Sequence, residues 1–422
     1  MMVLAQAFIR FFAAGGSLKN GDHVIEAILA CFYISILAIG VLHLGSTIRT
    51  AAHAPALLAL LVLAAVSASW AALPTVVLRR AVAVAGASFF ALVLASRRSL
   101  PEQLLLLRRV FRIEAACSLA LWGFQFATGI DLVTMGTSSN PMADGFDASA
   151  LRGIFGHKNG LGAMMALAIL VEWHLPVRGA LAKTIRILWL CGYTALLLFA
   201  NSVTALMACA GTLVILYAVR KFRNQYGLLV PLLTMAGLLG GALLMLFRDE
   251  AMRVLGRSAD LTGRTDLWHW VVIMIMKRPW LGYGYSGFWR GASDQSEVIE
   301  AHVGWSPIYA HNGYLELTLS LGLLGLALFL WIAGKGLWRA VRQAKAAENP
   351  QDLWPLAFMI FFVLHNLGEC TILMQNNMEW ALFMAVVIRT DPRLRLATSA
   401  EVAGPEPDPE LDTALAPSPE YV

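Results

Sequence analysis

RDEAMRVLGRSADLTGRTDLW, residues 248–268, opens the one long polar interval in a chain that is otherwise made of apolar blocks. The interval ends at His311, within SPIYAHNGYLELTLSLGLLGL, residues 306–326. Between them lies WHWVVIMIMKRPW, residues 268–280, which is too short to cross a hydrocarbon core that needs roughly 20 apolar residues. We therefore expect this segment to form a helix on or just inside the membrane surface. Because the interval carries seven basic and seven acidic side chains, it is not simply a basic patch.

Composition indicates an all-α polytopic membrane protein. Hydrophobic residues make up 58% of the chain, charged residues only 14%, and the mean hydropathy is +0.66. Soluble domains usually contain roughly a quarter charged residues. The net charge of +5 does not indicate nucleic-acid binding, because most Lys and Arg residues lie in short connectors between apolar blocks, where membrane orientation explains them.

The cysteines do not suggest a metal centre or a disulfide framework. None of the five forms a CxxC pair, and all lie within or at the edge of apolar segments: Cys31, Cys117, Cys191, Cys209 and Cys370. We expect neither metal nor cofactor.

Apolar blocks of spanning or near-spanning length recur along the chain and predict about eleven transmembrane helices. A doubtful twelfth lies at residues 3–16. We expect residues 1–396 to form one transmembrane unit with an external loop at 248–312, and residues 397–422, which are acidic and rich in Pro, to form a disordered cytoplasmic tail. The predicted spans are 24–45, 55–72, 80–97, 103–127, 159–176, 184–201, 203–219, 227–247, 313–333, 354–372 and 376–388.

Alternating basic connectors predict the orientation. By the positive-inside pattern they mark the cytoplasmic side, which leaves the loops 128–158 and 248–312 together on the external side. Arg79 and Arg80 do not fit this scheme. The connectors carry Arg178, Lys183 and Arg186; Arg220, Lys221 and Arg223; Lys335, Arg339, Arg342 and Lys345; and Arg389, Arg393 and Arg395.

LRGIFGHKNGLG, residues 151–162, is the first of three external segments that can bind an anion. Arg152, His157, Lys158 and Asn159 supply donors, and Asn159 or a neighbour can begin a helix whose N-terminal amides favour negative charge. The alternative is an interfacial turn whose basic residues meet lipid headgroups.

LTGRTDLW, residues 261–268, is the second external segment that can bind an anion. Thr265 or Asp266 can cap the short helix, which leaves Arg264 at its positive end, able to bind a phosphate bidentately. The alternative is that Arg264 pairs with Asp260 or Asp266.

YAHNGYLE, residues 309–316, is the third. His311 precedes the next span beside Asn312, a natural helix cap, although a histidine in this position is also commonly structural. In VLHNLGECTIL, His365 and Glu369 are ionisable groups inside an apolar block. Glu369 is expected near the outer face, as part of the external site or as a buried hydrogen-bonded strut; a transport relay is the less favoured reading.

The order RGIFGHKNG, then GRTDLW followed by KRPWLGYGYSGFW, then AHNGYLELTLSLGLLGLALFL resembles the O-antigen ligase and Wzy polymerase superfamily over roughly residues 24–390. The first motif is most similar to the branch of ExoQ-like exopolysaccharide polymerases. The resemblance implies a GT-C-like, inverting glycosyltransferase of the bacterial inner membrane that works at the periplasmic face. Its donor would be an oligosaccharide linked to undecaprenyl diphosphate, and it would need neither nucleotide sugar nor metal.

The resemblance also implies residue roles. The positions of Arg152 and Arg264 match the two essential arginines, which would hold the diphosphate as negative charge grows on it. His311 would take the proton from the attacking hydroxyl or orient that hydroxyl. Further candidates in substrate binding are His157, Lys158, Asn159, Asn312, Tyr314 and Glu369.

Three functions follow as hypotheses. The leading one is a polymerase that joins lipid-linked repeat units, with a lipid-linked glycan as acceptor. The second is an O-antigen ligase that delivers a glycan to lipid A core. The third, from a different class, is a transporter of the lipid-linked glycan. Besides donor, acceptor and membrane lipid, the expected partners are a chain-length regulator and export proteins.

Overall fold

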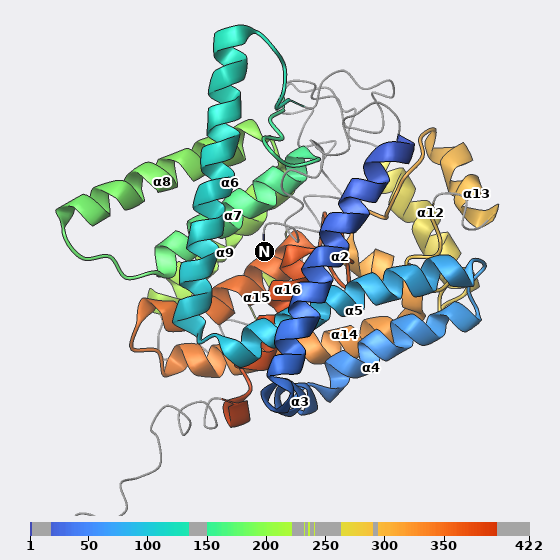
Figure 1. The fold of residues 1–422 in the computed structure, drawn as a ribbon. Coiled ribbons are helices and arrows are strands. Elements are labelled where there is room, and N and C mark those ends of the chain that lie inside the picture. Colours follow the sequence, from blue (N-terminus) through green and yellow to red (C-terminus); the bar gives the residue numbers. More distant parts are fainter. Residues whose placement is uncertain are drawn as a thin grey trace, which may run out of the picture.

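The computed structural model describes residues 18–134, 150–221, 263–289 and 294–394, together with a few isolated positions. Within these ranges the regular secondary structure consists of helices. The β-structure of the described residues is limited to one isolated bridge between Thr134 and Leu151. The predicted all-α class is therefore confirmed. The elements, labelled as in Figure 1, are α2 Leu18–Leu42, α3 Leu44–Ala52, α4 Pro55–Val66, η1 Ser67–Ser69, α5 Pro74–Arg97, α6 Leu100–Thr128, α7 Lys158–His174, α8 Ala180–Phe199, α9 Val203–Lys221, α12 Gly263–Lys277, α13 Asp294–Val303, α14 Gly313–Lys345, η3 Pro350–Leu353, α15 Trp354–His365 and α16 Met378–Arg389.

Every apolar block that falls within the described ranges coincides with a helix. By length and composition, four of these helices, α5, α8, α9 and α14, can cross a membrane; counting α2 and α3 as one bent span raises the number to five. Helix α6 is long enough, but it carries Arg108, Arg109, Arg112 and Glu114. A polytopic membrane protein is confirmed, whereas eleven or twelve spans stay a prediction. The block 227–247, the segment 3–16, the tail 397–422 and parts of the loop 248–312 lie outside the described residues.

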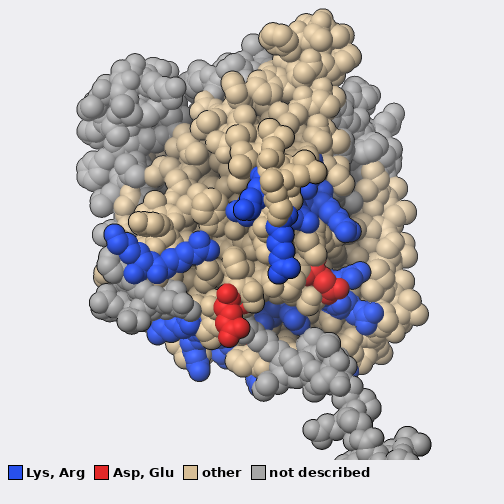
Figure 2. All heavy atoms as spheres, turned by 90° about the vertical axis from the view of Figure 1, so that its left-hand side faces the viewer, with Lys and Arg blue, Asp and Glu red and all other residues tan. Residues whose placement is uncertain are grey.

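Basic side chains gather on one face of the molecule. Figure 2 turns the α6 and α8 side toward the viewer and shows Lys and Arg side chains across the middle and lower part of that face, with mostly uncharged surface above. Basic residues gathered toward one end of such a face are the pattern that the positive-inside rule describes. That the basic side faces the cytoplasm stays a prediction.

Helices α15 and α16, in the middle of the molecule, are half the length of a span (Figure 1). Each has 12 residues, about 18 Å of helix, and each is almost entirely buried among its neighbours. The link between them, residues 366–377, is not helical, and none of its residues is exposed. Irregular backbone at membrane depth is tolerated where it is enclosed by protein or lines a cavity, because its polar groups must find partners there. The link is therefore the first place to look for a site.

The predicted short helix at 268–280 is helix α12, which begins already at Gly263. Its apolar side forms a small separate core with the segment that follows it and with the start of α14; Leu267, Val271, Phe288 and Leu319 are fully buried there. Thr265 and Asp266, the expected caps, lie inside the first turn instead. Arg264 does lie at the N-terminal end of the helix, as predicted.

A turn after α12 packs into a kink of α14 at Gly322, where φ is 67° and ψ is −171°. The amides of Leu323 and Tyr283 donate across the contact, to Pro279 O at 2.7 Å and Leu319 O at 2.9 Å. These bonds compensate for helical bonds that the kink removes. A Cβ atom on Gly322 would lie 2.1 Å from Trp280 O.

Replacing Gly322 by alanine is therefore expected to destabilise the protein by about 2–3 kcal/mol, because the side chain meets backbone and the φ value is strained for any L-residue. The measurement is the Tm of purified protein in detergent. Gly334→Ala, in an open part of the same helix, is the matched control and should leave Tm unchanged or slightly higher. Equal Tm values for the two variants would contradict the role of the kink.

Candidate functional site

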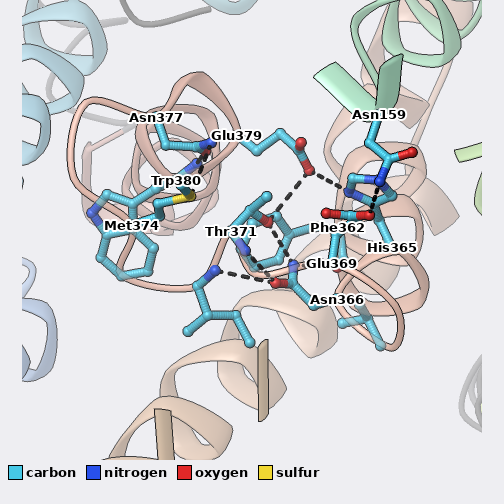
Figure 3. Close-up of polar contacts among 12 residues, drawn as sticks. Asn159, Phe362, His365, Asn366, Glu369, Thr371, Met374, Asn377, Glu379 and Trp380 are labelled. Atoms are coloured by element: carbon cyan, nitrogen blue, oxygen red, sulfur yellow. Dashed lines mark hydrogen bonds and ion pairs between the residues drawn. The ribbon is translucent and has the colours of Figure 1, made fainter. Parts of the chain in front are cut away.

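Two side chains from distant segments of the sequence reach Glu369 on the buried link. They are Arg264 of α12 and Asn159 of α7. Arg264 Nη1 donates to Gly368 O at 3.0 Å, and its Nη2 lies 3.7 Å from Glu369 Oε1. Asn159 Nδ2 donates to the same carboxylate oxygen at 2.5 Å (Figure 3). The ionic partner of Arg264 is therefore Glu369 rather than Asp266; Asp260, the other partner considered, lies outside the described residues. Glu369 is at once part of the candidate site and a hydrogen-bonded strut.

Helix α7 begins in the first predicted segment, as expected. It starts at Lys158, and its cap is His157, whose Nδ1 accepts the backbone N–H of Asn159 at 3.2 Å. The accepting Nδ1 carries no proton. The positive end of the α7 dipole and the Lys158 side chain thus lie next to the residues that hold Glu369.

Asn312 caps α14, as predicted, and also ties that helix to the link. Its Oδ1 accepts the N–H groups of Tyr314 and Leu315, both at 3.1 Å, while its Nδ2 donates to Leu367 O at 3.1 Å. Tyr314 donates through its hydroxyl to Val363 O at 2.9 Å. Because these polar atoms bind protein groups, Asn312 and Tyr314 act here as supports of the link.

His311 is placed at the start of α14 by a backbone with φ of 52°. Its ring lies 4.4 Å from that of Tyr309, and its Nδ1 is buried without a hydrogen-bond partner among the described residues. Burial, and then the positive charge of Arg264 and His157, lower the pKa of His311 well below its ordinary value. The imidazole is therefore neutral at pH 7 and near enough to Arg264 to be affected by its charge.

Arg152 lies in the turn that precedes α7. Its backbone N–H donates to Val133 O at 2.8 Å, and its charge interacts with Asp131, which follows α6. It is not among the residues that line the cavity described next, so a common site with Arg264 and His311 stays a prediction for Arg152.

A polar cavity of about 130 Å³ lies between the start of α7 and the link. His157, Asn159 and Glu369 line it, whereas Arg264 and His311 adjoin it through Glu369 and Tyr309. The full lining is Phe155, Gly156, His157, Asn159, Gly160, Ala163, Met164, Tyr309, His365, Glu369, Cys370, Thr371, Met374, Asn377, Met378 and Glu379.

The far wall of the cavity holds polar residues that were not predicted as site residues. His365 Nδ1 lies 2.9 Å from Glu379 Oε2, and Thr371 Oγ1 donates to the same oxygen at 3.4 Å (Figure 3). Asn377 caps α16 through Trp380 N–H at 3.0 Å. The signal in the sequence was a pair of short polar runs, HNLGEC and QNNME, that interrupt apolar blocks.

The arrangement has two electrostatic parts. On one side lie the guanidinium of Arg264, the N-terminus of α7 and the neutral imidazole of His311. These groups can bind an anion and accept a proton next to it. Carboxylates line the interior. The site, at the junction of the long loop and the buried link, thus holds groups that can bind an anion and accept a proton.

Comparison with known proteins finds a family likeness for part of the chain. Residues 187–330, about a third of the chain, match the sequence model of the O-antigen ligase family (Wzy_C), a range that includes most of α8, all of α9, Arg264, His311 and the first half of α14. The predicted resemblance to the O-antigen ligase and Wzy polymerase superfamily is thereby confirmed for this region. The narrower ExoQ-like assignment stays a prediction.

Similar curated proteins come from Rickettsia and bear the name "Putative polysaccharide ligase". The protein of Rickettsia conorii is 33% identical over 105 residues, which are 24% of this chain and 25% of the relative. That of Rickettsia felis is 34% identical over 91 residues, 21% of this chain and 22% of the relative. The chain thus spans about a quarter of the length of the curated relatives it matches.

Proposed function

We propose that this chain is a membrane glycosyltransferase that transfers an oligosaccharide from undecaprenyl diphosphate to a glycan acceptor at the periplasmic face of the bacterial inner membrane. The favoured form is a polymerase of exopolysaccharide or O-antigen repeat units. One observation carries the proposal: Arg264 and His311, both inside the region that matches the O-antigen ligase family, adjoin the same polar cavity. The reaction is inverting and metal-independent in this proposal.

Arg264 supplies positive charge to the departing diphosphate. When the bond between the anomeric carbon and the phosphate oxygen breaks, negative charge grows on the leaving group, and a fixed guanidinium stabilises it most where water is excluded. The bond to Gly368 O and the ion pair with Glu369 fix the Arg264 side chain before substrate binds. A guanidinium has five N–H donors, so these contacts leave others for phosphate oxygens.

His311 takes up the proton of the attacking hydroxyl or orients that hydroxyl. A general base must be unprotonated when the acceptor arrives, and burial beside Arg264 keeps the imidazole neutral. The positive charge of Arg264 also stabilises the anionic leaving group. The same charge therefore keeps His311 neutral and favours departure of the diphosphate.

The turn before α7 provides further positive charge. Arg152, His157 and Lys158 approach the site from the helix end whose amides favour anions. In this proposal Arg152, which does not line the cavity, holds a part of the diphosphate or lipid-linked sugar that projects past the cavity.

Reconstitution separates the candidate functions. Purified protein in liposomes receives an undecaprenyl-diphosphate-linked repeat unit, first alone and then with lipid A core. A ladder of longer glycans without core supports the polymerase, and a single transfer that needs core supports the ligase. If glycan only crosses the bilayer, and no glycan is joined under either condition, the enzyme proposal is wrong and the transporter stands.

The pH dependence of the reaction reports on His311. Because its folded-state pKa lies below the ordinary value of roughly 6.5, the base stays neutral as the pH falls through 6.5, and kcat/KM should be constant from pH 8 to 6.5 and fall only below that range. In the same acid window the unfolded chain binds the proton more readily, so stability decreases as the pH falls below about 6.5. Half-maximal kcat/KM at or above pH 6.5 would contradict a neutral, buried base.

A further inference from the structure

The innermost wall of the cavity holds the imidazole of His365, in which one ring nitrogen has a hydrogen-bond partner and the other has none among the described residues. His365 is 1% exposed, its Nδ1 lies 2.9 Å from Glu379 Oε2, and its ring stacks on Phe361 at 5.2 Å. A carboxylate accepts hydrogen bonds, so Nδ1 carries a proton and donates to Glu379, which leaves Nε2 available to a ligand. Within the described part of the chain Nε2 has no hydrogen-bond partner, and His365 lines the cavity.

Carboxylates are prominent in the cavity interior. Glu369 and Glu379 line it, and the amide donor of Asn159 is already used by Glu369. A ligand that presents several O–H donors would complement this surface. A phosphate or carboxylate would face two acidic groups at short range in a buried site, where charges interact strongly. The diphosphate therefore belongs beside Arg264, outside the cavity, and an uncharged polyol belongs within it.

The size and the apolar part of the lining fit a single ring. The cavity volume is about 130 Å³, and a cavity of roughly 150 Å³ is known to hold benzene. Phe155, Met164, Met374 and Met378 supply apolar surface, and the methionines adapt readily to the shape of a ligand. One six-membered ring with C–H faces and hydroxyl edges matches both kinds of wall.

We propose that this cavity is a monosaccharide subsite that accepts one uncharged pyranose ring, with His365 Nε2 forming a hydrogen bond with a ring hydroxyl, and that it excludes uronic acids. The identification of the ring as part of a glycan substrate rests on the proposed function. Glu379 acts as a positioning residue, because its carboxylate holds the His365 ring through Nδ1. The subsite thus restricts the sugar next to the reacting bond to a neutral one.

The test uses small probes and purified full-length protein in nanodiscs. Methyl pyranosides of gluco, galacto and manno configuration, each paired with its uronic acid, are compared by saturation-transfer NMR. At least one neutral glycoside should bind saturably, and its uronic acid should bind at least about tenfold more weakly. If no neutral glycoside binds, or if a uronic acid binds equally well, the subsite proposal is wrong.

Charge removal makes the test specific to the cavity. Glu379→Gln keeps an acceptor for His365 Nδ1–H but removes one negative charge, so the preference for the neutral sugar should shrink to about threefold or less. If Glu379→Gln folds poorly, Glu369→Gln replaces it in the test and should reduce the preference for the neutral sugar in the same direction. Glu297→Gln, on the exposed side of α13, is the matched control and should keep the tenfold preference. An unchanged preference in both cavity variants would overturn the assignment.

Failure of this inference and failure of the proposed function are distinguishable. Turnover of a lipid-diphosphate donor without binding of any neutral pyranoside would remove the subsite and leave the glycosyltransferase in place. Binding of neutral pyranosides without turnover under any acceptor condition would leave a sugar-binding cavity and remove the enzyme.

Discussion

Replacing Arg264 by alanine is expected to lower the turnover of a lipid-diphosphate donor by about a thousandfold while the protein still inserts and folds. The guanidinium is the cation that the structure fixes next to the cavity, through Gly368 O and Glu369, and its removal leaves the departing diphosphate without that stabilisation. It also leaves Glu369, which is 7% exposed, without its ionic partner. The measurement is release of undecaprenyl diphosphate in proteoliposomes.

Two comparisons make this result specific. Arg264→Lys keeps the charge but not the planar fork that binds Gly368 and a phosphate together, so it should restore only a small part of the activity. Arg278→Ala removes an exposed arginine just after α12 that packs on Tyr283, and it should leave turnover within about twofold. Near-normal turnover in Arg264→Ala would show that the diphosphate is held elsewhere.

Arg152→Ala is expected to abolish glycan joining as well, since both arginines serve the same anion in the proposed function. This variant tests the resemblance to the superfamily most directly, because that resemblance, and not a cavity contact, carries the role of Arg152. Full activity of this variant would confine diphosphate binding to Arg264 and the α7 terminus.

Replacing His311 by alanine should lower kcat by about 10²–10⁴-fold, the usual contribution of a general base, with a smaller effect on KM. His311→Gln separates the two roles left open above. An orienting residue can be replaced in part by an amide that hydrogen-bonds the acceptor hydroxyl, whereas a base cannot. His302→Ala, an exposed histidine in the last turn of α13, is the control and should be active.

The outcome for His311 also separates enzyme from transporter. A transporter of lipid-linked glycan has no proton to abstract, so it would keep most of its activity in His311→Ala. Loss of glycan joining together with unchanged donor binding would support the base. Unchanged glycan joining would mean that another group accepts the proton. His365 is then the next residue to replace.

Elements specified by local pattern could be predicted from the sequence. Apolar length gave the helices, and the helix starts at Lys158 and Gly313 follow from a turn or a capping residue directly before them. The cap expected at Thr265 or Asp266 was wrong because α12 already includes Gly263, which puts both residues in its first turn. Local signals fix the type of an element better than its ends.

The parts that depend on distant contacts could not be predicted. The partner of Arg264 is Glu369, and the polar run HNLGEC does not by itself show that Arg264 reaches it. Blocks 354–372 and 376–388 looked like spans because apolar length alone was visible, whereas burial among other helices lets α15 and α16 stop after 12 residues each. The contact of His365 with Glu379 exists only because these two short helices meet at that link.

The most direct test of the central claim is a cryo-EM structure of the protein in nanodiscs with undecaprenyl diphosphate bound. The account predicts phosphate density within hydrogen-bonding distance of the Arg264 guanidinium, on the side of Glu369 that faces His311, with the cavity beyond it free of phosphate. Diphosphate density inside the cavity beside Glu379, or at a site remote from Arg264, would contradict it.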